Sequence, residues 1–247
     1  MSSRIEQKAA ARRRREALEA AERRAARRRR SLIQLALVTV AALSVVATAI
    51  YLSRPGDEPK AAVTTSFAGI PQDGIALGSP DAPVTLVEFA DLQCPYCAVY
   101  ATEVLPTIVD RYVRPGKLRL ELNVLTFLGD DSVRAGRVAA AAAQQDGLWS
   151  FSDAFFHNQG TENSGYATDD FLRETAERAG LDADAVLAER DGEAAAGLLG
   201  DAQAQADKLG VDSTPSFFLR GADGELEPLE VSDLTPETFT AALDEAL

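Results

Sequence analysis

The chain has 247 residues, and its 38 acidic and 25 basic side chains give a formal net charge of −13. This length allows one sizeable domain with additional segments. The charge is divided unevenly, because residues 1–30 hold 12 Lys and Arg against 4 Asp and Glu, whereas residues 31–247 hold 13 against 34. The acidic part is excluded as a nucleic-acid binder, since phosphate binding needs clustered positive charge.

The N-terminal part has the pattern of a membrane anchor. Residues 31–53 contain no charged side chain, and the apolar run 32–52 would span roughly 30 Å as a helix, enough to cross a bilayer. The basic arm 1–30 ends in four arginines, Arg27–Arg30, and basic residues are retained in the cytoplasm. We therefore predict a single-pass cell-membrane protein with a cytoplasmic N-terminus and an extracytoplasmic domain.

Three alternatives bear on this part of the chain. The apolar run could be a buried core helix, or a signal peptide cleaved after Ala49, although the arm and the run are both long for a signal. The basic arm could bind nucleic acid, but a topology signal resting on anionic headgroups needs fewer assumptions. Cleavage would leave the rest of the chain exported as well.

Residues 54–72 are rich in Pro and Gly and show no apolar periodicity, which predicts a linker. The folded domain is expected at 73–247. It opens with a buried strand at 83–90, followed by a helix at 94–113 that Pro106 should kink, and then a second strand at 117–124. This strand–helix–strand order predicts a parallel pair of strands.

An Ala-rich helical insertion is expected over about 126–206, with loops at 160–165 and near Gly180. A third strand at 216–220, a turn at 222–224 and a fourth strand at about 226–231 should follow. The last helix, 234–247, has Thr235 as its N-cap and Pro236 at its first position. The domain is therefore predicted to be α/β with an inserted helical subdomain.

The two cysteines, Cys94 and Cys97, form a C-x-x-C motif where the first strand meets the first helix. Residues three apart in a first helical turn share a face, so the two sulfurs can bond to each other. Unpaired N–H groups and the positive helix end favour thiolate at the first position. Cys94 is thus the expected nucleophile, and Cys97 the residue that resolves the mixed disulfide.

Two other roles for the motif are weaker. A structural zinc site needs four ligands, and the chain has no third cysteine and one histidine, His157, in an unrelated helical context. A purely structural disulfide would close a very short loop, where cross-linking stabilises least. No metal is therefore expected.

The stretch VEFADLQCPYC at 87–97 resembles the active-site segment of the DsbA-like thiol–disulfide oxidoreductases. The resemblance continues in 74–83, FLG at 127–129, LWSF at 148–151 and LGVDSTPSFF at 209–218, and so covers roughly residues 73–247. It implies a thioredoxin-like fold with a helical insertion. It also implies a redox-active Cys94–Cys97 disulfide with no further cofactor.

The same resemblance assigns roles to residues around the motif. Thr214–Pro215, which taken alone could simply mark a strand boundary, is expected to form a cis peptide bond beside Cys94 and to pair with extended substrate segments. Glu88 occupies the place of a buried acid that accepts a proton from Cys97; it could instead be a solvated strand-end carboxylate. Pro95 and Tyr96 complete the predicted site.

Tyr96 departs from the strongly oxidising members of the family, which carry His between Pro and the second Cys. A histidine cation would hold the nucleophilic thiolate, and tyrosine cannot do this at neutral pH. We therefore expect a less oxidising couple and a less acidic Cys94 than in those members.

The predicted function is exchange of disulfides with exported, cysteine-containing proteins, most simply as a disulfide donor regenerated by a membrane redox partner. A tethered isomerase or reductase would use the same residues. A different class of function is a chaperone-like module that binds extended segments near Pro215 and for which redox chemistry is incidental.

Overall fold

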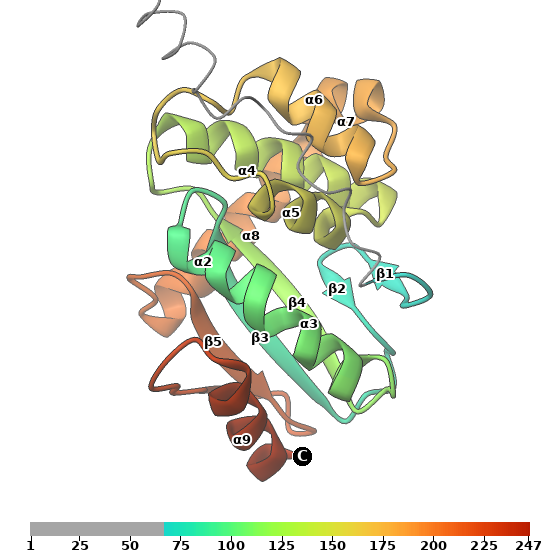
Figure 1. The fold of residues 1–247 in the computed structure, drawn as a ribbon, viewed down its shortest axis with the longest axis vertical. Coiled ribbons are helices and arrows are strands. Elements are labelled where there is room, and N and C mark those ends of the chain that lie inside the picture. The colour runs from blue at the N-terminus through green and yellow to red at the C-terminus, as the bar shows by residue number, and fades with distance from the viewer. Residues whose placement is uncertain (1–66) are drawn as a thin grey trace, which may run out of the picture. The chain divides into compact units, whose positions relative to one another are not determined.

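The computed structural model describes residues 67–247, and Figure 1 shows their fold. The predicted basic arm, transmembrane helix and linker up to residue 66 lie outside the described residues. Within 67–247 no helix is both long and apolar enough to cross a membrane. Phe67 and Ile70 are buried in the core, so the packed unit begins before the boundary predicted at residue 73.

The centre of the fold is a sheet of strand order β1-β2-β4-β3-β5-β6. Strands β3 and β4 are parallel along their whole length, as predicted, and the other neighbours are antiparallel. The short hairpin of β1 and β2 was not predicted, because two-residue strands carry no periodicity. The strands are β1 (Gln72–Asp73), β2 (Ala76–Leu77), β3 (Val84–Asp91), β4 (Leu118–Leu125), β5 (Ser216–Arg220) and β6 (Leu226–Pro228).

The side chains of β3 alternate between two hydrophobic clusters, one on each face of the sheet. Leu86 and Ala90 belong to the larger cluster, while Val87 and Phe89 belong to a smaller one with Phe218 of β5. Since successive side chains of a strand point to opposite faces, Glu88 lies on the face of Leu86 and Ala90. Its carboxyl group is therefore directed into the main core.

One helical run connects β3 to β4, as predicted. It comprises α2 (Pro95–Val99), a π-helical turn η1 (Tyr100–Val104), α3 (Leu105–Ile108) and a second π-helical turn η2 (Val109–Val113). Pro106 has no N–H to donate, and just before it the N–H of Leu105 donates to the carbonyl of Tyr100, five residues back. The backbone thus changes its hydrogen-bond spacing next to the proline.

The helical insertion predicted at about 126–206 is confirmed, with helices from Asp130 to Leu209. In Figure 1 the helices between Asp130 and Glu189 lie above the sheet, and the helix Glu193–Leu209 runs behind it. Phe155 packs against Phe151, Phe156, Tyr166 and Phe171 in its core. The helices are α4 (Asp130–Ala142), the 3-10 turn η3 (Ala143–Gln145), α5 (Leu148–Phe156), α6 (Asp169–Arg178), α7 (Ala183–Glu189) and α8 (Glu193–Leu209).

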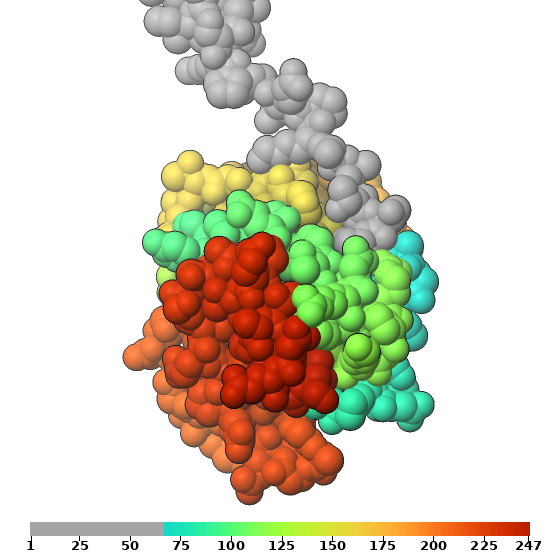
Figure 2. Space-filling view, turned by 60° about the horizontal axis from the view of Figure 1, so that its bottom comes forward, coloured from blue at the N-terminus to red at the C-terminus, as the bar shows by residue number. Residues whose placement is uncertain are grey.

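Helices cover both faces of the sheet. Ala202 and Ala206 of α8 join the smaller cluster, opposite the face that carries α2 and α3. The last helix, α9 (Pro236–Ala246), is capped by Thr235, whose hydroxyl accepts from the N–H of Thr238, as predicted. Figure 2 shows this helix in red on the surface, and it packs on α3.

Candidate active site

The C-x-x-C motif begins where β3 turns into α2. The carbonyl of Asp91, the last residue of β3, accepts from the N–H of Cys94 at 2.9 Å, which closes the turn. Cys94 is the N-cap of α2, with extended backbone angles, and Pro95 takes the first helical position. The first cysteine therefore stands at the positive end of the helix, as the sequence predicted.

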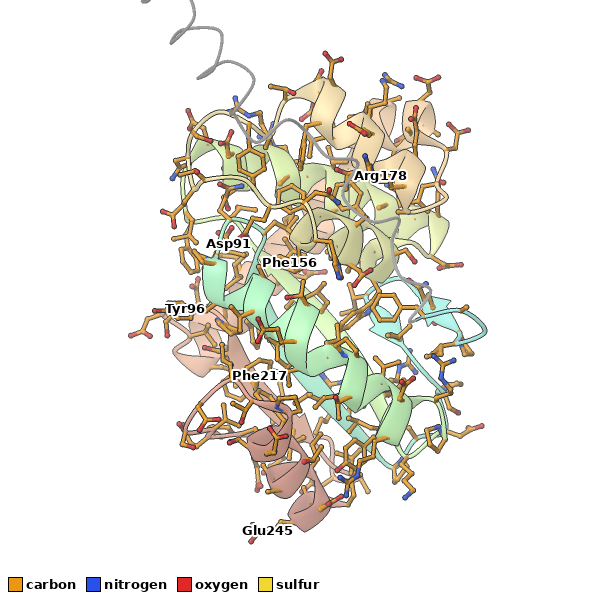
Figure 3. The ribbon with its side chains drawn as sticks, viewed as in Figure 1. Asp91, Tyr96, Phe156, Arg178, Phe217 and Glu245 are labelled. Atoms are coloured by element: carbon orange, nitrogen blue, oxygen red, sulfur yellow. The ribbon has the colours of Figure 1, made fainter. Side chains whose placement is uncertain are left out.

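The structure brings the predicted site residues together. The Sγ atom of Cys94 lies 3.2 Å from the carbonyl oxygen of Thr214, and the Thr214–Pro215 bond is cis. Both cysteines are free thiols, and Cys97 is completely buried. Tyr96, which lies within the motif, is by contrast 66% exposed (Figure 3).

The pKa values of the two thiols are shifted in opposite directions. The pKa of Cys94 is lowered from the ordinary 9.0 to about 6, chiefly by the hydrogen bond that its sulfur accepts from the Cys97 thiol. Burial opposes this shift, while the hydroxyl of Thr214 assists it. The pKa of Cys97 is raised well above 9.0, first by burial and then by its hydrogen bond to Cys94. At neutral pH the pair therefore holds one thiolate, on Cys94.

Glu88 is a buried acid and not a solvated strand-end carboxylate, since only 3% of it is exposed. Burial, with a smaller contribution from the Cys94 thiolate, raises its pKa from the ordinary 4.5 to about 8. Its charge in turn raises the pKa of Cys97, which places the two groups within electrostatic reach. A carboxyl group that is largely protonated at neutral pH can donate a proton to a departing Cys97 thiolate and later accept one.

Asp91 is a site residue that the sequence analysis missed. Its carboxylate is fully buried and accepts from the N–H of Gln93 at 2.8 Å. The other oxygen accepts from the N–H groups of Phe127 and Leu128, both at 3.1 Å, and from the hydroxyl of Ser132 at 2.6 Å. Asp91 thus joins the cysteine turn to the loop between β4 and α4.

The loop between α5 and α6 holds the same turn from the other side. The side chain of Gln159 donates to the carbonyls of Leu92 and Cys94, at 2.7 and 3.1 Å. Buried Gln93 donates to the hydroxyl of Tyr166 at 2.8 Å and accepts from the N–H of Asn163 at 3.1 Å. These partners stand some seventy positions away in the chain, so no local pattern could reveal them.

Phe127 adds an exposed aromatic side chain next to this turn. It is 46% exposed, and with Tyr96 it is one of three large hydrophobic residues exposed to this degree within 67–247. Its backbone N–H is held by the Asp91 carboxylate, which also accepts from Gln93 of the cysteine turn.

Among the described residues, no three His, Cys, Asp or Glu side chains converge to hold a metal ion.

A family model described as "Thioredoxin" matches residues 71–245, and the chain belongs to this family. The "Probable disulfide bond formation protein D" of Bacillus cereus is 35% identical over 99 residues, covering 39% of this chain. Those residues span 46% of that relative, so the chain matches about half the length of this curated protein.

Two solved structures share the fold. BdbD from Bacillus subtilis in its oxidised form superposes with a TM-score of 0.60 at 20% identity, covering 71% of this chain and 96% of BdbD. A thioredoxin-like oxidoreductase from Silicibacter pomeroyi gives a TM-score of 0.55 at 29% identity, covering 73% and 95%. The thioredoxin-like fold with a helical insertion is therefore established for this chain.

Proposed function

We propose that the chain is a thiol–disulfide oxidoreductase that exchanges disulfides with exported proteins through Cys94 and Cys97. The observation that carries this proposal is the unequal placement of the two thiols: Cys94 stands at the start of α2, 3.2 Å from the Thr214 carbonyl oxygen, whereas Cys97 is completely buried. Their pKa values shift in opposite directions, that of Cys94 to about 6 and that of Cys97 well above 9.0. A purely structural pair needs no such asymmetry, whereas exchange needs a nucleophile that also leaves well. The similarity to disulfide bond formation protein D supports the same chemistry.

The steps follow from this asymmetry when the enzyme acts as donor. A substrate thiolate attacks Cys94 of the disulfide, the Cys94–Cys97 bond breaks, and Cys97 departs and takes a proton from Glu88. A second substrate thiolate then attacks the substrate sulfur of the mixed disulfide. Cys94 is released as a thiolate, which is stable at neutral pH because its pKa is about 6. The substrate is oxidised by two electrons and the enzyme is reduced by two.

The donor direction is favoured because a stabilised Cys94 thiolate stabilises the reduced enzyme, which makes the couple more oxidising. An extended substrate segment would lie along Thr214, with Tyr96 and Phe127 offering it apolar contact. Regeneration would require a membrane redox partner. We further propose that residues 31–53 anchor the domain outside the cytoplasm, in keeping with the basic arm that precedes them.

Two cysteine variants test the exchange chemistry. Cys97→Ser should accumulate mixed disulfides between Cys94 and substrates, visible as thiol-sensitive bands on non-reducing gels, whereas Cys94→Ser should lose activity. Full biological activity of Cys94→Ser would refute the proposal and favour a binding module.

Thiol alkylation of intact cells tests direction and location together. A membrane-impermeant reagent should label Cys94 only after reduction, because a disulfide donor is held mostly oxidised and faces outward. A mostly reduced pair would indicate an isomerase or reductase, and labelling that requires cell lysis would contradict the proposed location.

A further inference from the structure

A small cavity lies between the sheet, the active-site helix and α5. Its volume of about 10 Å³ is close to what one water molecule needs. Three polar side chains line it, those of Glu88, Ser152 and Asp153, among apolar groups that include Trp149 and the Phe156 labelled in Figure 3. The cavity therefore joins the buried acid of the active site to a second carboxyl group from the helical insertion.

Two of these polar groups lack protein partners. Within residues 67–247, neither the hydroxyl of Ser152 nor the Oδ2 atom of Asp153 has a hydrogen-bond partner. Both residues are buried, and an unpaired buried polar group is costly. A water molecule in the cavity would satisfy both of them, since it offers two donors and two acceptors.

Asp153 also reaches toward the surface. Its Oδ1 atom lies 3.4 Å from Nδ1 of His157, the C-cap of α5, whose side chain is 27% exposed. The same ring nitrogen lies 2.9 Å from the backbone carbonyl oxygen of Asp153. Burial raises the pKa of Asp153 to about 6, and the positive charge of His157 opposes this shift. Asp153 thus lies between the cavity and the partly exposed imidazole of His157.

The exchange chemistry creates a need for such a group. When the reduced enzyme is oxidised near pH 7, Glu88 starts and ends protonated because its pKa is about 8, while the Cys97 thiol loses its proton. One proton must therefore leave a buried site. Three other titratable groups interact with Glu88. Cys94 is bonded to the substrate sulfur at this stage and cannot take the proton, and the pKa values of Cys97 and Tyr100 are raised well above their ordinary ranges.

We propose that Asp153 is a proton-relay residue: the proton that Cys97 gives up passes from Glu88 through a water molecule in this cavity to Asp153, and past His157 to solvent. This inference rests on the exchange chemistry proposed above. Ser152 holds the water, and the partly exposed imidazole of His157 lies between Asp153 and the solvent.

The reaction of reduced full-length protein with oxidised glutathione tests the relay, because it separates the two sulfur steps. First the Cys94 thiolate attacks glutathione disulfide and releases one glutathione thiolate. The rate of this step is proportional to the concentration of glutathione disulfide. Cys97 then loses its proton and attacks Cys94, the bond between Cys94 and glutathione breaks, and a second glutathione thiolate leaves at a concentration-independent rate. Acid quenching and mass spectrometry follow both steps.

Asp153→Asn should slow the second step about tenfold near pH 7 and leave the first unchanged. Its second step should also slow more in D₂O than that of the wild-type protein, because proton transfer has become limiting. Ser152→Ala should show the same pattern more weakly. Asp201→Asn, which alters an exposed carboxyl group on α8, is the matched control and should leave both steps unchanged.

The possible failures are distinguishable. A wild-type protein that shows no first step would refute the proposed function itself. A normal first step with a second step that Asp153→Asn leaves within twofold of the wild-type rate would refute the relay. Equal slowing of both steps would also refute it, because Asp153 would then shape the cysteine site without moving protons.

Discussion

Replacing Glu88 by Gln should stabilise the protein while impairing its exchange chemistry. The folded state binds a proton at Glu88 up to about pH 8, whereas the unfolded chain releases it near pH 4.5. Between these values the unfolded state binds fewer protons, so the free energy of unfolding falls by about 1.36 kcal/mol for each pH unit. At pH 7 the accumulated loss is about 3 kcal/mol, which the neutral amide of Gln avoids.

Urea unfolding of the reduced full-length protein in non-ionic detergent, followed by circular dichroism from pH 5 to pH 8, measures this effect. The difference in unfolding free energy between Glu88→Gln and wild type should be small at pH 5 and grow with pH. Taking the difference removes the opposite contribution of Cys94, whose lowered pKa adds stability as pH rises above 6. Glu103→Gln changes an exposed carboxyl group on η1 and should show no such trend. A Glu88→Gln curve parallel to wild type across this range would refute the reasoning.

Three further predictions concern the cysteine turn. The rate at which iodoacetamide alkylates Cys94 in the reduced protein should rise around a midpoint of about pH 6, since the Cys97 thiol stabilises the thiolate; a midpoint near 9 would contradict this. Asp91→Asn should lower the free energy of unfolding by about 3 kcal/mol in urea titrations, because one amide oxygen cannot accept all four hydrogen bonds of the buried carboxylate, while exposed Asp130→Asn should change little. Tyr96→His should make the Cys94/Cys97 couple more oxidising, as measured by its redox equilibrium with glutathione. A wild-type reduction potential already as high as roughly −120 mV would show that Tyr96 does not make the couple less oxidising.

Most of the fold could be predicted because its main elements carry strong local patterns. The buried strand at 84–91 and the alternating strand at 118–125 appear where predicted, each displaced by one residue. Thr235 caps the last helix as its residue type suggests. β6 is shorter than the predicted strand and ends at Pro228, whose nitrogen cannot donate to the sheet.

Some residues of the candidate site are close to the C-x-x-C motif in sequence, and others are distant from it. Cys94 and Cys97 were predicted because the motif and the helix start are contiguous in sequence, and Glu88 was predicted from the resemblance to the DsbA-like family. Asp91 carried one overlooked signal, since it is a carboxylate at the end of a buried strand, directly before the cysteine turn. The contacts of Gln159 and Tyr166 carried none, because they depend on how the insertion folds back over the turn.

The two acids of β3 explain why the insertion belongs to the site. Glu88 and Asp91 are three residues apart on one strand, so their side chains point to opposite faces of the sheet. Asp91 meets four hydrogen-bond donors and fixes the turn, whereas Glu88 faces a cavity whose other polar wall is α5. The insertion thus holds the Cys94 turn through Gln159, and its helix α5 lines the cavity beside Glu88. A thioredoxin-like sheet without it would keep both cysteines but would lose Gln159 from the turn and Asp153 from the cavity.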